Sequence, residues 1–209
     1  MAADLPPEEL RYQLDHIYED KGPDCAAFYL VCTVLVIIFV GLRITCRLER
    51  KASFGADDWV FFAGATLTLG SFAVLLAYVF AAGLGTHWIS LTPEQVILSG
   101  KIYYANTILS IVNYPLIKIS ILLLYKRIFV TPHIRIFAGL GVAFLALFTT
   151  ACLFTVMFSC IPVRSYWDST VSARCINTTK FFIAYTLINI GTDLGQKIAL
   201  YVLFGVGSL

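Results

Sequence analysis

The stretch IYYANTILSIVNYPLIKISILLLY, residues 102–125, decides the fold class of this chain. It carries a single charged residue, Lys118, among apolar and small polar residues. At a rise of about 1.5 Å per residue, a helix of this length crosses the hydrocarbon core of a bilayer, which is about 30 Å thick. The stretch is therefore predicted to be a transmembrane helix.

Apolar blocks of similar length lie on both sides of this stretch. Together with it they predict four firm spans, at residues 26–44, 58–82, 102–126 and 135–158. Hydrophobic residues make up 59% of the chain and charged residues 13%, whereas a soluble domain carries about 25% charged residues. The fold class is therefore predicted to be all-α, a polytopic transmembrane helix bundle whose first partner is the lipid bilayer.

The C-terminal part of the chain is apolar but interrupted. Its two apolar pieces, residues 181–194 and 198–209, are each too short to span a membrane comfortably. Joined into a fifth helix over residues 178–209 they cross easily, but Asp193 and Lys197 then lie near mid-membrane, where a charged residue costs roughly 3 kcal/mol. Because one helical turn separates them, these two side chains can partly neutralise each other.

Basic residues predict the orientation of the bundle. They follow the first and third spans, in two groups: Arg43, Arg47, Arg50 and Lys51, then Lys126, Arg127 and Arg135. Short loops rich in Lys and Arg stay in the cytosol, so both connections are predicted to be cytosolic. Residues 1–24 are then an acidic extracellular segment before the bundle at residues 25–209. This segment has no signal-peptide pattern, so no cleavable leader is expected.

The predicted outer loop, residues 159–180, carries two features typical of extracellular segments. Cys160 and Cys175 can form a disulfide outside the cytosol, the alternative being two free thiols. Asn177 begins the tripeptide Asn-Thr-Thr and is a candidate glycosylation site, although this tripeptide also occurs by chance. Both features agree with the orientation derived from the basic residues.

One face of the third span is polar. At about 100° per residue, Tyr103, Asn106, Ser110, Asn113 and Tyr114 fall on one side of the helix, which is predicted to face the centre of the bundle. Two interpretations remain open. The side chains line a ligand cavity, or they join neighbouring helices by hydrogen bonds.

Lys118 is a buried charge within the third span. It is predicted to form a switch-like ion pair with Asp57 or Asp58 at the start of the second span, the alternative being an ammonium group that snorkels to the inner interface. The two aspartates also precede a helix directly, and capping of its N-terminus is favoured over acid-base catalysis. With Asp193 and Lys197, these residues are the ion-pair candidates.

The sequence gives no support for an enzyme, a metalloprotein or a nucleic-acid-binding protein. It has no G-x-S-x-G elbow, phosphate-binding loop, H-E-x-x-H helix or dinucleotide glycine motif. His87 and Glu94 in an outer connection are too few and too scattered to indicate a metal site. The net charge of +2 leaves no broad basic face for nucleic acid. No cofactor is expected.

Short motifs spread over about residues 25–195 resemble one family of membrane proteins. The matching residues are Arg43, Arg47, Gly55-Ala56-Asp57-Asp58-Trp59, Gly83-Leu84-Gly85-Thr86-His87-Trp88, Tyr114-Pro115, Lys118-Ile119-Ser120, Tyr125-Lys126-Arg127-Ile128-Phe129, Cys160-Ile161-Pro162, Trp167 and Cys175. The Asp-Asp-Trp and Lys118 segments are the most specific. On these motifs the chain resembles the fungal rhodopsin-domain family.

This resemblance implies a seven-helix receptor, similar to G-protein-coupled receptors, in the plasma membrane of a filamentous fungus. Such a receptor is expected to sense an unknown extracellular or lipophilic ligand and to signal to a cytosolic transducer, such as a G protein, through the loop with Lys126, Arg127 and Arg135. Neither Lys118 nor Lys197 matches a seventh-helix lysine that binds retinal, so no chromophore is expected.

The C-terminal segment departs from the family pattern. After the run from Asn189 to Asp193, family members complete the fifth helix and enter a basic loop, whereas this chain passes almost directly into Gln196 and Lys197. The junction resembles a deletion and leaves an incomplete seven-helix bundle. We therefore expect a truncated gene model, a splice variant or a decayed paralogue. A decayed paralogue would have no function.

Two other functions remain open. A small-solute transporter would also use a polar helix face and a buried lysine, but the chain has no internal repeat to support it. A non-signalling scaffold is the third possibility. Solute flux in vesicles would indicate a transporter, and a ligand-dependent cytosolic signal would indicate a receptor.

Overall fold

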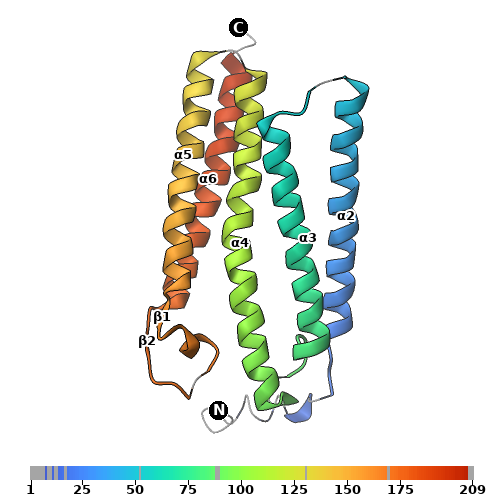
Figure 1. The fold of residues 1–209 in the computed structure, drawn as a ribbon, viewed down its shortest axis with the longest axis vertical. Helices are drawn as coiled ribbons and strands as arrows, with labels where there is room; N and C mark the ends of the chain where they lie inside the picture. The colour runs from blue at the N-terminus through green and yellow to red at the C-terminus, as the bar shows by residue number, and fades with distance from the viewer. Residues whose placement is uncertain are drawn as a thin grey trace. The chain divides into compact units, whose positions relative to one another are not determined.

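Long helices make up most of the computed structural model, which describes residues 18–51, 53–87, 90–129, 131–168 and 170–206, together with residues 8, 11 and 14–16. The elements are α2 (Gly22–Glu49), α3 (Ala56–Ala82), α4 (Pro93–Ile128), α5 (Pro132–Met157), β1 (Cys160–Ile161), the 3-10 helix η3 (Val163–Tyr166), β2 (Arg174–Cys175) and α6 (Thr178–Val206) (Figure 1). The predicted all-α class is confirmed. Much of the acidic segment 1–24, Trp88 and residues 207–209 lie outside the described part.

Four of the described helices, α2 to α5, are long and apolar enough to cross a membrane, with mean hydropathies of 1.8 to 2.7 in their most apolar windows. Many of their large apolar side chains are exposed, as expected for helices surrounded by lipid. The chain is therefore a multi-pass helical membrane protein. The fifth helix, α6, runs without a break through both apolar pieces of the C-terminal segment.

The largest boundary difference concerns α4, which begins at Pro93 instead of residue 102. Thr92 and Gln95 form a capping box before the apolar block: the Thr92 N–H donates to Gln95 Oε1 (2.9 Å), and the Gln95 N–H donates to Thr92 Oγ1 (3.3 Å). Polar residues can thus continue a membrane helix beyond the hydrocarbon core. Hydropathy alone does not detect such an extension.

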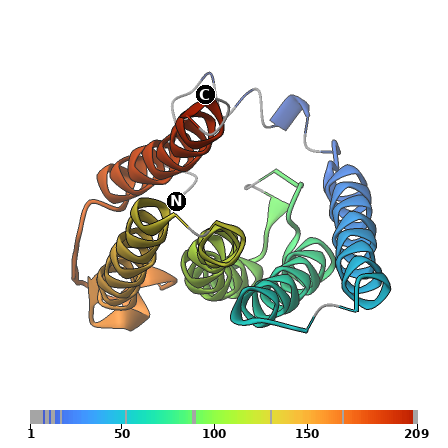
Figure 2. The same ribbon diagram turned by 90° about the horizontal axis from the view of Figure 1, so that it is seen from above.

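The chain divides into two compact units, and α3 and α4 contribute to both. The first unit comprises residues 1–53, 65–110 and 164–171. In it α2 lies beside α3, with the rings of Tyr29 and Phe72 stacked 6.2 Å apart (Figures 1 and 2). The Lys21 N–H donates to the carbonyl of Gly85 (3.0 Å). Gly85 has a φ of +107° and a side chain there would meet the backbone of Lys21, so this close approach requires glycine.

The second unit comprises residues 54–64, 111–163 and 172–209. In it the second half of α4 lies beside α5 and α6 (Figures 1 and 2). Leu122 of α4 packs with Ala138 and Leu145 of α5 in a buried apolar cluster. The rings of Phe148 and Tyr185 stack 5.9 Å apart and join α5 to α6. The candidate functional residues described next belong mainly to this unit.

Candidate functional site

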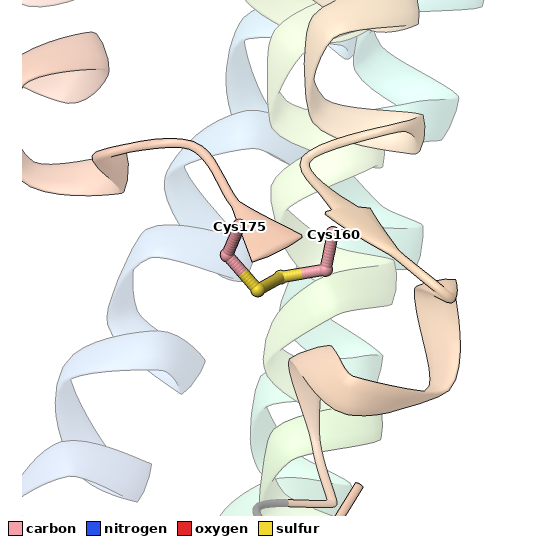
Figure 3. The surroundings of a disulfide bond; sticks show 2 residues. All are labelled: Cys160 and Cys175. Carbon is pink, nitrogen blue, oxygen red and sulfur yellow. A yellow bond between two sulfur atoms is a disulfide. The ribbon is translucent and has the colours of Figure 1, made fainter. Parts of the chain in front are cut away.

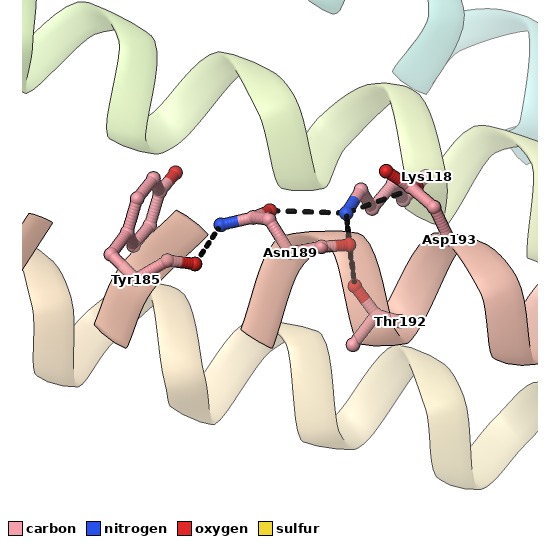
Figure 4. A network of polar contacts seen from close by, with 5 residues as sticks. All are labelled: Lys118, Tyr185, Asn189, Thr192 and Asp193. Atoms are coloured by element: carbon pink, nitrogen blue, oxygen red, sulfur yellow. Dashed lines mark hydrogen bonds and ion pairs between the residues drawn. The ribbon is translucent and has the colours of Figure 1, made fainter. Parts of the chain in front are cut away.

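A charged network within the second unit joins α4 to α6. The buried Lys118 ammonium group donates to the Asn189 carbonyl (2.9 Å), to Asn189 Oδ1 (3.0 Å) and to Thr192 Oγ1 (2.9 Å). It also forms an ion pair with Asp193 Oδ1 (3.0 Å) (Figure 4). One ammonium group on α4 is thus surrounded by four oxygen atoms of α6, which accounts for a lysine at membrane depth.

Hydrogen bonds within α6 hold these acceptors in place. The Asn189 amide donates to the Tyr185 carbonyl (2.9 Å), which turns its Oδ1 toward Lys118 (Figure 4). The Thr192 hydroxyl donates to the Asn189 carbonyl (2.8 Å) and accepts from Lys118. The Asn189 carbonyl and the Thr192 hydroxyl therefore each take part in two hydrogen bonds of one connected network.

The predicted pairing of Lys118 with Asp57 or Asp58 is wrong, because Lys118 pairs with Asp193. The reason is that Lys118 and the residue that binds the aspartates lie at different heights and on different sides of α4. The aspartates bind Arg127, which is nine positions beyond Lys118 and hence about 13 Å along the helix and about 180° around it. The predicted neutralisation of Asp193 by Lys197 is also replaced, since the Asp193 carboxylate contacts Lys118.

A second charged cluster in the same unit joins the start of α3 to the end of α4. Arg127 Nη1 lies 3.0 Å from Asp57 Oδ1 and 3.4 Å from Asp58 Oδ2, and both carboxylates are buried. The Ser120 hydroxyl donates to the Asp57 carbonyl (3.0 Å) and adds a neutral contact between the helices. One partly exposed guanidinium group therefore neutralises two buried carboxylates.

The start of α3 also depends on Asp58. The Gly55 N–H donates to Asp58 Oδ2 (3.0 Å), while the Asp58 and Trp59 N–H groups donate to the Gly55 carbonyl (3.1 and 3.3 Å). This is the geometry in which an acidic side chain in the first turn caps a helix. Asp58 thus serves two purposes, the helix start and the contact with Arg127.

The five ligand-cavity candidates of the third span differ in burial and fall in different units. Tyr103, Asn106 and Ser110 belong to the first unit, and Asn113 and Tyr114 to the second. Asn113 is buried, Asn106 and Ser110 are partly buried, and the two tyrosines are exposed. Their role as the lining of a ligand cavity therefore stays a prediction.

The connection between α5 and α6 carries the disulfide between Cys160 and Cys175 (Figure 3). The two cysteines face each other in the antiparallel pair β1–β2, and the Ile176 N–H donates to the Ser159 carbonyl (2.8 Å) beside them. Asn177 is exposed and its Oδ1 accepts from the Lys180 N–H (3.0 Å), which caps α6. The cap uses the oxygen of the amide and leaves the nitrogen, the atom that carries a glycan, out of this bond. Glycosylation stays a prediction.

In the first unit, aromatic side chains of the connection between α5 and α6 pack on α4. The Tyr104 ring lies 4.8 Å from the Tyr166 ring and 5.7 Å from the Trp167 ring. Burial raises the pKa of Tyr166 to about 12, against a smaller lowering by its hydrogen bond with Thr107. Tyr166 is therefore a neutral hydroxyl at physiological pH.

The three residues predicted to contact a cytosolic transducer have different surroundings. Lys126 and Arg135 are exposed, whereas Arg127 is held by the two aspartates of α3. Only Lys126 and Arg135 of these three present side chains that no described ion pair engages.

Sequence reasoning missed part of both clusters. Asn189 and Thr192 were not assigned to a site, although with Asp193 they place three polar groups on one face of an apolar segment, a signal of a buried partner. Arg127 was assigned to transducer contact alone. Within the described residues, no group of three His, Cys, Asp or Glu side chains is placed to hold a metal ion.

Comparisons with known proteins agree with this architecture. The sequence model of the family described as "Fungal rhodopsin domain" matches residues 42–203. The chain is 26% identical to the "Polyenoic acids biosynthesis gene cluster protein Ba17b" of Metarhizium anisopliae, over 84% of this chain and 49% of that protein. It is 30% identical to a "SAT4 family membrane protein" of Emericella nidulans, over 59% of this chain and 33% of that protein. The chain thus spans half or less of these relatives, and no solved structure matches it.

Proposed function

This chain belongs to the fungal rhodopsin domain family, and we propose that it is a receptor-like protein of the plasma membrane that senses an extracellular or lipophilic cue. In this proposal the N-terminus is outside, and the connections between α2 and α3 and between α4 and α5 are cytosolic. The transducer is a cytosolic protein, a G protein by family resemblance. The proposed role involves no catalysis and no cofactor.

The single observation that carries the proposal is the Lys118 network. Ionisable residues at membrane depth are costly, and they usually serve a pathway or a switch. Here a lysine of α4 is bound only to α6 in the described residues, so a change in the position of α6 must lengthen or exchange these four contacts. A network that exists in one arrangement and breaks in another is a two-state element that a ligand can bias.

The second charged cluster supports a route toward the cytosol. The same helix, α4, ends with Arg127 bound to the start of α3, directly before the connection to α5. We propose that a shift of α4 changes this contact and the exposure of Lys126 and Arg135 beside it. These two side chains would then meet the transducer.

The proposed chemistry of the cue follows from the polar face of α4 and from one relative. Tyr103, Asn106, Ser110, Asn113 and Tyr114 are the candidate contacts on α4. One relative is named after a polyenoic acid gene cluster, which is the reason for including a lipophilic cue beside a polar extracellular one.

The test measures nucleotide exchange on a fungal G protein in membranes that contain the chain. A lipid extract of fungal culture is added as the probe, and stimulated GTPγS binding is expected with the natural chain. Lys118→Met is expected to abolish the stimulation, and Lys197→Met, an exposed lysine of the same network region, is expected to retain it. Solute flux without nucleotide exchange would favour a transporter, and neither response would leave a scaffold.

A further inference from the structure

An apolar groove lies between α4, α5 and α6 in the second unit, with a volume of about 330 Å³. Leu122 and Leu145, both buried, form its floor. Phe137 and Phe144 of α5 stand beside it and are half-exposed. At Gly195 a side chain would enter open space, whereas at Gly141 a Cβ would meet the Leu122 side chain at 3.0 Å, so Gly141 allows α4 and α5 to approach closely. The groove is therefore open on the side where α5 presents its aromatic rings.

The lining of the groove restricts what can occupy it. Seven of its nine lining residues are apolar side chains or glycines, and two of its three helices, α4 and α5, are long and apolar enough to cross a membrane. Where such helices are surrounded by lipid, an open apolar groove between them is filled by a hydrocarbon chain and not by water. A methylene group takes roughly the 30 Å³ that a water molecule takes in the liquid, so the volume suits about ten carbon atoms.

Two polar residues, Thr192 and Gln196, line one side of the groove. They determine which head group the occupant can carry. The Thr192 hydroxyl is engaged, since it accepts from Lys118 and donates to the Asn189 carbonyl. Gln196 offers both a donor and an acceptor, and no described group hydrogen-bonds to its side chain. An amide of this kind suits a hydroxyl, ester or amide group.

Charge argues against an ionised head group. None of the described residues that line the groove carries a charge. Lys118 is close in sequence to Leu122, but its ammonium group is already bound to three neutral oxygens and to the Asp193 carboxylate. A carboxylate or phosphate in the groove would therefore be desolvated without a counter-ion, which is costly.

We propose that this groove binds a single-chain amphiphile with an uncharged polar head, such as an alkyl alcohol or an alkyl glycerol ether. The hydrocarbon chain lies over Leu122 and Leu145, between Phe137 and Phe144, and the head hydrogen-bonds to Gln196. The bound head also lies next to Thr192, which is part of the Lys118 network. This proposal does not rest on the receptor role. Its test measures binding of the amphiphile and requires no signal.

The test uses the full chain in lipid nanodiscs and a photoreactive, alkyne-tagged decyl glycerol ether as the probe. Labelling is expected to saturate with probe concentration, and mass spectrometry is expected to place it in α5 near Phe137–Leu145 and in α6 near Thr192–Gln196. Competition by untagged decyl glycerol ether is expected, and decanoate at neutral pH should compete at least tenfold more weakly.

Glycine variants provide matched controls for the groove. Gly195→Leu adds a side chain in open space on the groove wall and is expected to lower saturable labelling at least tenfold. Gly191→Leu, one turn earlier on the same helix, and Gly139→Leu on α5 also meet nothing nearby but do not line the groove. Both are expected to label like the natural chain. Gln196→Leu should weaken competition by the glycerol ether several-fold.

Three outcomes would overturn the proposal. Labelling of the natural chain that rises without saturation and spreads over exposed residues of all helices would indicate bulk lipid only. Equal loss of labelling in Gly191→Leu and Gly195→Leu, with loss of a chemically crosslinked dimer, would indicate that a second copy of the chain covers this face. Stronger competition by decanoate than by the ether would exclude an uncharged head. The measurements on the natural chain decide the matter even where a variant does not fold.

Discussion

The two charged clusters of the second unit have opposite arrangements. In the α4–α6 cluster the cation is buried, with the Lys118 side chain 10% exposed, and its carboxylate partner Asp193 is 51% exposed. In the α3–α4 cluster the carboxylates are buried, with Asp57 at 2% and Asp58 at 0%, and Arg127 is 34% exposed. Three neutral oxygens and one carboxylate surround the lysine, whereas two carboxylates share one arginine.

The buried partner of each cluster determines which residue the cluster needs most. Loss of one partner of a buried ion pair costs far more than the pair contributes, because it leaves an uncompensated charge. Removal of Arg127 takes its cation away from two buried carboxylates. Removal of Asp193 leaves an ammonium group that still has three hydrogen-bond acceptors. The clusters should therefore respond very differently to loss of an ion-pair partner.

The largest effect is expected for Arg127→Met. The buried carboxylates of Asp57 and Asp58 would lose the guanidinium group that contacts both, so the free energy of unfolding should fall by about 3–5 kcal/mol. The measurement is an SDS titration of the chain in mixed micelles. Lys126→Met, at the exposed neighbouring position, serves as the control and should change little. If Arg127→Met is as stable as the control, the buried aspartates are not held by this arginine. Asp57→Asn combined with Arg127→Met should recover part of the loss.

A smaller loss is expected for Lys118→Met. Three neutral oxygens of α6 lose their donor, which costs about 1–3 kcal/mol in all, while the half-exposed Asp193 is not trapped as a buried charge. The same titration measures this loss. Lys197→Met on α6 should leave the unfolding free energy unchanged within error. A loss larger than that of Arg127→Met would contradict the comparison of the two clusters.

A still smaller loss is expected for Asp193→Asn. The amide oxygen can accept from Lys118 in place of the carboxylate, and the contacts with Asn189 and Thr192 stay, so we expect about 0.5–1.5 kcal/mol. The decisive measurement is the order of the two variants in one titration series. If Asp193→Asn lowers the free energy of unfolding more than Lys118→Met does, attraction between charges and not hydrogen bonding holds α6 to α4.

The sequence predicted the helices well because length and apolarity alone make a segment cross a bilayer. The blocks around Lys118 and the interrupted segment after residue 178 were both placed in helices, and the structure places them there. The N-terminal extension of α4 was missed, because the short apolar run Val96–Leu98 is flanked by polar residues and only the capping box at Thr92 marks the helix start. Hydropathy indicates which part of a helix crosses the hydrocarbon core, and it does not indicate how far the helix continues beyond it.

The charged residues were identified from the sequence, but their partners were not. A lone lysine or aspartate in an apolar segment indicates a partner, whereas the identity of the partner depends on rotation and depth of two helices. Lys118 and Arg127 lie on opposite sides of α4, and their spacing in the sequence is enough to predict this. The packing of the helices decides which neighbour each side of α4 faces. The partners on α6 and α3 therefore follow from the structure and not from the sequence.

The smallest effect is expected at a third kind of charged contact, in the part of the α5–α6 connection that belongs to the first unit. Arg164 Nε donates to Asp168 Oδ2 (3.2 Å), and the Thr170 hydroxyl and N–H donate to Asp168 Oδ1 (2.6 and 3.2 Å). Thr170 first, and Arg164 after it, lower the pKa of Asp168 from its ordinary value of 3.8. The stabilisation of this turn is therefore complete above pH 3.8 and is lost as the pH falls through the lowered folded-state pKa.

The pH dependence of the Thr170 amide resonance in an NMR titration measures this loss. Its midpoint should lie below 3.8, Thr170→Val should raise the midpoint more than Arg164→Gln, and Asp168→Asn should abolish the titration. Arg164 is the more exposed and solvent-screened partner, so its charge should matter less than the two hydrogen bonds from Thr170. A larger effect of Arg164→Gln would mean that an exposed cation acts on its carboxylate as strongly as Arg127 acts on the buried aspartates. The contrast between buried and exposed charges would then fail.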